Sequence, residues 1–195
     1  SLDENGITLA SQTSLDNERG SISTKGALKL TAQALSNTVG SMTALKDLDI
    51  KATTISNAGG ALQAKQRLLL DTGASGSLSN SAGGTLQGEE LVLNAPNFSN
   101  AGGKLIQTGS KDLVLKVNTS LNNSGGLIAT NSQNFSIETL AIHNAGGQIQ
   151  HGGTGTFSLL QPQTINNQSG RISSNGALIL DTQKINNSAG AKIEA

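Results

Sequence analysis

Two stretches of the chain decide the fold: Ile55–Leu70, which reads ISNAGGALQAKQRLLL, and Ile165–Leu180, which reads INNQSGRISSNGALIL. In both, an aliphatic residue stands two positions before an asparagine, and a glycine stands three positions after it. A second aliphatic residue and then a Φ-x-Φ pair follow, where Φ is aliphatic or Phe. The same unit recurs along the chain, and a period of roughly 20 to 50 residues indicates a repeat architecture.

The asparagine of the unit occurs nine times, at intervals of 20 to 23 residues. The nine copies are Asn17, Asn37, Asn57, Asn80, Asn100, Asn123, Asn144, Asn167 and Asn187. The matching glycines are Gly20, Gly40, Gly60, Gly83, Gly103, Gly126, Gly147, Gly170 and Gly190. Within each unit the apolar residues alternate with period two and never show the spacing of a helix, so the sequence predicts short strands separated by turns.

A single unit could bury only about four or five aliphatic side chains, roughly 10 kcal/mol of gross stabilisation. Ordering its roughly twenty residues costs about 1 kcal/mol each in backbone entropy. The units must therefore stack on one another, which predicts an all-β fold, a parallel β-helix (β-solenoid) of about nine rungs of 20 to 23 residues. Residues 1–195 are expected to form one segment of this β-helix, truncated at both ends because the chain starts and stops part-way through a rung.

The asparagine column is expected to serve the turns. Asparagine tolerates left-handed backbone angles, and its carboxamide can bond to the equivalent carboxamide one rung away. The glycine at the fixed offset is expected to supply a positive φ. A sugar or ion site on the asparagines is the alternative, but nine identical copies favour a structural ladder.

Composition excludes several classes of function. Thirteen basic and thirteen acidic residues give a net charge of zero, without a basic cluster, which argues against nucleic acid as a partner. The chain has no cysteine and two histidines, which leaves no usual zinc spacing, and we expect no metal or cofactor. No run of about 18 apolar residues and no basic-then-apolar start is found, so we expect neither a transmembrane helix nor a signal peptide in these 195 residues.

The acidic residues do not suggest a catalytic site. Lys51/Asp71 and Lys116/Glu138 are expected to pair across neighbouring rungs at the surface. The only tight acidic groupings, Asp47/Asp49 and Glu89/Glu90, are interpreted as solvated turns and strand faces, so we expect no catalytic residue and no enzyme. His143 falls in an outward polar column of Ser and Asn.

Three consecutive units have a longer connection before their Φ-x-Φ pair. These connections, Thr108–Lys111, Ala129–Asn134 and His151–Gly155, should lie side by side and form a low ridge along one edge. Loops that depart from a regular scaffold commonly carry binding function, which makes Lys111, Asn131, Gln133 and His151 candidate partner contacts. The alternative is that insertions at a solvent-facing turn are simply tolerated, and this reading is favoured.

The residue between the two Φ positions should face outward. In three consecutive units it is aliphatic, at Leu69, Val92 and Val114, which predicts an exposed apolar stripe. Such a stripe could dock a receptor, another shaft or an additional segment. Alternatively, β-branched residues simply favour strands.

The repeated N-[SA]-G-G, followed by an aliphatic residue, a short polar turn and L-x-L, resembles the haemagglutinin repeats of filamentous haemagglutinin-like exoproteins. The resemblance covers essentially the whole chain. It implies a right-handed β-helical shaft on a very large Gram-negative protein that an outer-membrane transporter partner exports by two-partner secretion. The family includes adhesins and the effectors of contact-dependent growth inhibition.

The leading hypothesis is therefore a non-enzymatic shaft segment, secreted or at the cell surface of a Gram-negative bacterium, that holds distal domains of the same exoprotein away from the cell. The second hypothesis is that the segment itself binds a cell-surface receptor through the ridge or the stripe. The third and least favoured is a carbohydrate-active β-helix enzyme.

Overall fold

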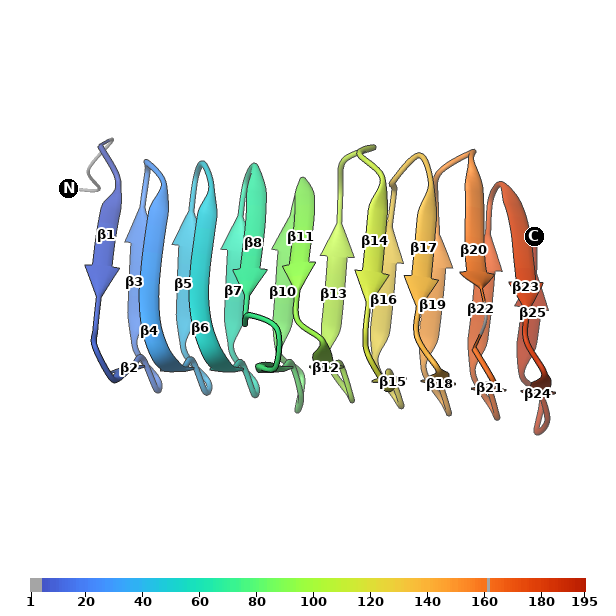
Figure 1. Cartoon of the computed structure of the whole chain (residues 1–195). Helices are drawn as coiled ribbons and strands as arrows, with labels where there is room; N and C mark the ends of the chain where they lie inside the picture. The colour runs from blue at the N-terminus through green and yellow to red at the C-terminus, as the bar shows by residue number, and fades with distance from the viewer. Residues whose placement is uncertain (1–4, 161) are drawn as a thin grey trace.

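A computed structural model describes residues 5–160 and 162–195, and every regular element in this part of the chain is a β-strand. The strands coil into an all-β parallel β-solenoid of about nine turns, stacked along a single axis (Figure 1). The predicted fold class is confirmed. No helix in the described residues is long and apolar enough to cross a membrane.

Three faces run along the solenoid. The Φ-x-Φ strands form the L-x-L face: β1 (Ile7–Ala10), β8 (Arg67–Asp71), β11 (Glu90–Asn94), β14 (Leu113–Lys116), β17 (Phe135–Glu138), β20 (Thr156–Leu160) and β23 (Ala177–Asp181). The asparagine face contains β2 (Ser14–Asp16), β9 (Ser77–Ser79), β12 (Asn97–Ser99), β15 (Ser120–Asn122), β18 (Ala141–His143), β21 (Thr164–Asn166) and β24 (Lys184–Asn186). The long strands of the second and third turns belong to both faces: β4 (Leu28–Ser36) and β6 (Leu48–Ser56).

The third face follows the glycines, and we call it the post-glycine face. Its strands are β3 (Ser21–Thr24), β5 (Ser41–Ala44), β7 (Ala61–Ala64), β10 (Thr85–Gly88), β13 (Lys104–Gln107), β16 (Leu127–Thr130), β19 (Gln148–His151), β22 (Arg171–Ser174) and β25 (Lys192–Glu194). This face and the asparagine face are paired without interruption from the first turn to the last. The L-x-L face is divided, because β11 pairs with β8 and β14 pairs with β17, but β11 and β14 do not pair.

The core is a column of Φ side chains in register from turn to turn. Leu48 lies opposite Leu68, and Leu68 lies opposite Leu91. All three phenylalanines are buried at Φ positions, and the rings of Phe135 and Phe157 stack with centroids 4.5 Å apart. The core is therefore aliphatic with a short aromatic section, as the composition predicts.

The predicted backbone role of the asparagine is wrong. The left-handed residue stands two positions after it in every turn, at Arg19, Val39, Gly59, Ala82, Gly102, Gly125, Gly146, Ser169 and Ala189. The glycine at the fixed offset is required for a different reason: the backbone of the preceding turn passes too close to it for a side chain. A Cβ on Gly60 would lie 2.0 Å from the backbone oxygen of Asn37 in the preceding turn, and one on Gly126 would lie 2.2 Å from that of Asn100. A positive φ at the fixed-offset glycine occurs only in the two turns that run one residue late, at Gly83 and Gly190.

Candidate functional site

The asparagines form an internal ladder along one edge of the core. Each Nδ2 donates to the Oδ1 of the asparagine in the next turn over eight consecutive steps, at 2.6 to 2.8 Å. The side chains from Asn37 to Asn167 are fully buried. Nδ2 also donates to backbone carbonyls, for example from Asn123 to Gly126 and to Gln148 of the following turn. The carboxamides from Asn37 to Asn167 are thus used internally, which gives the ladder a structural role.

The longer connections lie where the post-glycine face meets the L-x-L face. They bond to one another through the backbone, since Gln133 N donates to the Ser110 oxygen at 2.7 Å and Gly155 N donates to the Gln133 oxygen at 3.1 Å. The Asn131 side chain donates to the Thr108 oxygen at 3.3 Å. The three connections therefore stack into one edge, which we call the corner ridge (residues 108–112, 131–134 and 152–155). Among the predicted contacts, Lys111, Asn131 and Gln133 are exposed on it.

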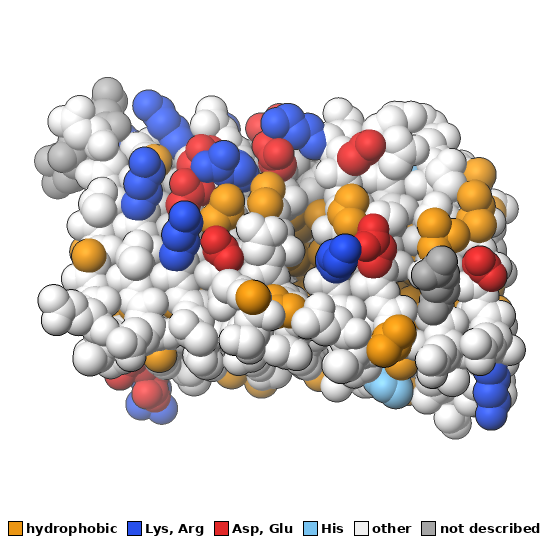
Figure 2. Space-filling model, viewed as in Figure 1, with side chains coloured by type: hydrophobic (Ala, Val, Ile, Leu, Met, Phe, Trp, Pro, Cys, Tyr) orange, Lys and Arg blue, Asp and Glu red, His pale blue; other side chains and the backbone are white. Residues whose placement is uncertain are grey.

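A charged depression of about 490 Å³ lies beside the first connection of the ridge. It is lined by Asp47, Gln66, Arg67, Glu89, Glu90, Gly109, Ser110 and Lys111. Figure 2 shows that basic and acidic side chains gather along this edge of the molecule in the β1–β14 part. The two acidic groupings noted in the sequence therefore lie beside one depression, and three of their four carboxylates, those of Asp47, Asp49 and Glu90, form ion pairs with basic groups.

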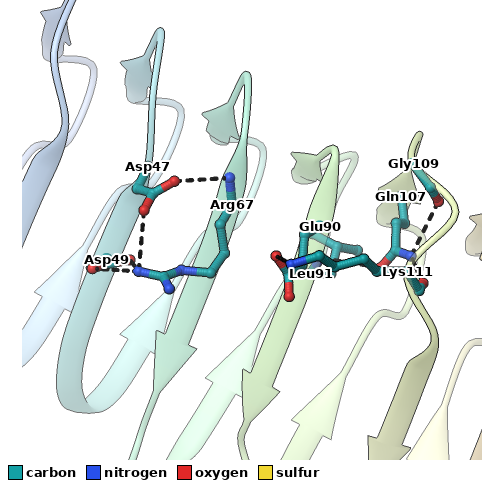
Figure 3. Close-up of polar contacts among 8 residues, drawn as sticks. All are labelled: Asp47, Asp49, Arg67, Glu90, Leu91, Gln107, Gly109 and Lys111. Carbon is teal, nitrogen blue, oxygen red and sulfur yellow. Dashed lines mark hydrogen bonds and ion pairs between the residues drawn. The ribbon is translucent and has the colours of Figure 1, made fainter.

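Arg67 is the centre of this cluster (Figure 3). Its Nη2 donates to both carboxylate oxygens of Asp49, at 2.9 and 3.0 Å, and lies 3.2 Å from Asp47. The hydrogen bond to Asp49 is the main cause that raises the pKa of Arg67, and burial opposes it. The Nε of the guanidinium is buried without a hydrogen-bond partner in the described structure.

The other side of the depression is an ion pair between neighbouring turns. Lys111 Nζ lies 2.8 Å from a carboxylate oxygen of Glu90. Glu89 is exposed and forms no ion pair in the described residues. The depression thus offers one unpaired carboxylate, that of Glu89, beside the exposed ammonium group of Lys111, which suits a polar partner with both donors and acceptors.

His151 is not a surface contact, and that prediction is wrong. Its side chain is 2% exposed and points into the core beside the rings of Phe135 and Phe157. The two ring nitrogens lie 2.8 Å from the Ser132 carbonyl oxygen and 2.9 Å from the Ser174 hydroxyl. His151 ends strand β19 at an inward position, and Ser132 of the preceding turn and Ser174 of the following turn provide the partners that make this burial possible. His143 is exposed, as expected.

The predicted apolar stripe is divided by the break in the L-x-L face. Leu69 and Val92 are half-buried register partners on β8 and β11. Val114 is 50% exposed on β14, which does not pair with β11. Two exposed leucines on the same side were missed, Leu140 (51%) and Leu160 (44%), which line a shallow depression with Lys116 and Glu138. Both stand just outside the Φ-x-Φ pattern, so the repeat gave no signal for them.

The predicted cross-rung ion pairs differ from each other. Lys116 and Glu138 are register partners and form an ion pair at 3.3 Å. Lys51 and Asp71 are register partners too, but no ion pair joins them in the described structure. No group of three or more His, Cys, Asp or Glu side chains in the described residues could hold a metal ion.

Comparison with known proteins agrees with the repeat. The haemagglutinin repeat family matches residues 5–87, 68–125, 106–159 and 161–195. A protein named tRNA nuclease CdiA-2, from Burkholderia pseudomallei (strain 1026b), is 36% identical over 88 residues, which are 44% of this chain and 3% of that protein. The chain thus corresponds to a small part of this relative's length. No solved structure gives a significant match.

Proposed function

We propose that this chain, which belongs to the haemagglutinin repeat family, is a structural segment of the shaft of a large exoprotein. The observation that carries the proposal is the ladder of eight consecutive asparagine bonds between two uninterrupted sheet faces. Each turn makes the same contacts with its neighbours, so each additional turn makes the rod longer without changing its cross-section. At about 4.8 Å for each turn, nine turns extend the protein by roughly 43 Å.

The family relationship supports a setting for this shaft. We place it in a protein that is secreted to, or held at, the surface of a Gram-negative cell after export by an outer-membrane transporter partner. Its task is to hold distal domains away from the cell, for adhesion or for contact-dependent growth inhibition. The relative's name gives a nuclease activity, but the match covers only 3% of that protein, and we propose no catalytic role for the repeats.

The shaft proposal is tested by changing the number of turns in the parent exoprotein. Duplicating residues 124–167, which adds two turns, should lengthen the rod by about 10 Å in electron micrographs and leave secretion intact. The distal activity should persist, with a changed reach between cells. Loss of that activity on duplication, with normal export and folding, would contradict a spacer role.

A second function has a specific observation in its favour, which is the charged depression beside the corner ridge. Its unpaired Glu89 and the exposed Lys111 could contact a receptor. The test shortens the three connections of the corner ridge to the two-residue connection found between β7 and β8. A companion variant replaces Leu69, Val92 and Val114 with Ser or Thr. Unchanged receptor or cell binding in both variants would end this hypothesis. A segment that acts only as a shaft should keep its fold and its length in both variants.

A further inference from the structure

The break between β11 and β14 is the one place where the described L-x-L face loses its pairing. Strands β8 and β11 share five register pairs, and β14 and β17 share four, but none joins β11 to β14. Figure 1 shows that β11 and β14 are spaced more widely than the neighbouring strands on this face. The post-glycine face stays paired at the same level through β10 and β13. The asparagine face stays paired there through β12 and β15, with Ser99 and Asn122 as register partners.

A sudden change in connection length explains the break. Only Glu89 separates β10 from β11, whereas five residues, 108–112, separate β13 from β14. This is the largest step in connection length between adjacent turns at this corner. The short connection brings β11 close to the corner, and the long one lets β14 start farther away, so the two strands do not meet in register.

A side chain replaces the missing backbone partner at one position. Gln107 is buried at the end of β13, and its Oε1 accepts a hydrogen bond from Leu91 N at 3.1 Å. In the second turn, the equivalent amide, that of Leu28, donates to a backbone oxygen, that of Asp47. The Nε2 of Gln107 donates to the Lys111 and Gly109 oxygens, at 2.5 and 3.3 Å (Figure 3). A single side-chain hydrogen bond therefore stands where the other turns have backbone hydrogen bonds between L-x-L strands.

The core side chains of β11, beside the break, are also more exposed to solvent than those of β8. Leu91 and Leu93, the inward residues of β11, are 3% and 8% exposed. Leu68 and Leu70, at the same positions on β8, are at 0%. The depression lined by Glu90 and Lys111 lies at one end of the break, and a second, lined by Leu93, Pro96 and Lys116, lies at the other. The edge of the core is therefore slightly more exposed along this line than at β8.

We infer that the break is a joint, at which the solenoid opens before any other described turn-to-turn interface and about which its two parts bend. The continuous post-glycine and asparagine faces act as the spine, and the L-x-L face opens. Local opening occurs where backbone hydrogen bonds and buried contacts are fewest, and both are fewest here. This inference goes beyond the shaft role, because a rigid and a jointed shaft would have the same length.

Amide hydrogen exchange of the unmodified 195-residue chain tests the joint directly. Amides of β11 should exchange at least tenfold faster than the register-matched amides of β8, while those of β10 and β13 stay protected. Gln107→Ala should accelerate exchange at Leu91 further and leave β17 unchanged. Equal protection of β11 and β8 would overturn the inference.

A disulfide across the joint gives an independent measurement, because the chain has no cysteine of its own. The pair Val92→Cys/Val114→Cys crosses the break, and its matched control, Leu69→Cys/Val92→Cys, links register partners on β8 and β11. Oxidation of the first pair should suppress the fast exchange of β11, and oxidation of the control should not. Two outcomes would refute the joint: neither crosslink slows amide exchange in β11, or only the control crosslink slows it.

Discussion

The turns before the break, from β1 to β11, and those after it, from β14 to β25, share one repeat but differ at their corners. Before the break the connections into the L-x-L face are short, and the surface beside them is charged around Arg67. Beyond the break come longer connections, a core that contains Phe135, Phe157 and His151, and exposed Leu140 and Leu160. The asparagine ladder is the same in both parts.

The comparison shows that the repeated positions determine the core and the asparagine ladder, whereas the connections at the corner determine how individual turns differ. Core and ladder positions depend on register with the neighbouring turns, and a change there disturbs both neighbours. A corner faces solvent, and an added residue costs little closure entropy. Substitutions at shared positions should therefore have equal effects in the two parts, and substitutions at corners should not.

The largest expected effect comes from a charge in the shared core. Leu70→Asp before the break and Phe157→Asp after it should each destabilise the fold by more than about 4 kcal/mol, because an unpaired carboxylate would be buried. Circular dichroism and thermal melting measure the loss. Val114→Asp, at a half-exposed outward position, is the control and should change little. Wild-type melting of either core variant would contradict the inward column.

The glycine pair of one turn separates close approach from left-handed geometry. Gly126→Ala would place its Cβ 2.2 Å from the Asn100 backbone oxygen and should cost about 3 kcal/mol. Gly125→Ala has open space around its Cβ, and only its φ of 63° opposes the change, at about 1 kcal/mol. Denaturant titration gives both values, and the reverse order would refute the assignment of the two glycines.

The ladder should be equally important on both sides of the break. Asn57→Ala and Asn123→Ala each remove the donor to a buried Oδ1 in the following turn and one acceptor of a buried Nδ2 in the preceding turn, at an expected cost of about 2 kcal/mol. Asn122→Ala, one residue from the ladder and directed outward, should cost less than about 0.5 kcal/mol. Unequal values for Asn57 and Asn123 in denaturant titrations would show that the ladder is not uniform.

The smallest effect is confined to the second part. His151→Ala removes two buried hydrogen bonds and contacts with Phe135 and Phe157, and should lower stability by about 1 to 2 kcal/mol. His143→Ala, on an exposed side chain, should leave the melting temperature unchanged. Hydrogen exchange should place the loss in β16 to β22 and spare β3 to β10. A global loss, or equal effects of the two histidines, would contradict a local role.

Periodicity was sufficient to predict the strands, their parallel stacking and the burial of Phe98, Phe135 and Phe157. It could also place the asparagines above one another, because a repeat in register stacks equivalent residues. The backbone angles were outside its reach: Asn and Gly are both typical of left-handed positions, and only the structure shows that the left-handed residue lies between them.

The surface was harder to predict for a related reason. The burial of His151 depends on Ser132 and Ser174, which belong to neighbouring turns and carry no sequence signal of their own. The break at β11 depends on the difference between two connection lengths, and the lengths alone do not give the offset between the strands. Arg67 meets Asp47 and Asp49 because β6 and β8, one turn apart, are in register. The sequence pattern places these residues in neighbouring positions but does not show that their side chains turn toward one another.

The asparagine ladder also has a direction. All eight bonds run from an Nδ2 donor in one turn to an Oδ1 acceptor in the turn that follows it in the sequence. Each completed turn therefore presents a positioned amide donor to the next one, with the backbone edges of three strands beside it. Because the donors point toward the later turn, the C-terminal end of any stretch of turns offers an amide donor and the N-terminal end offers an acceptor, so the two ends of the ladder are chemically different.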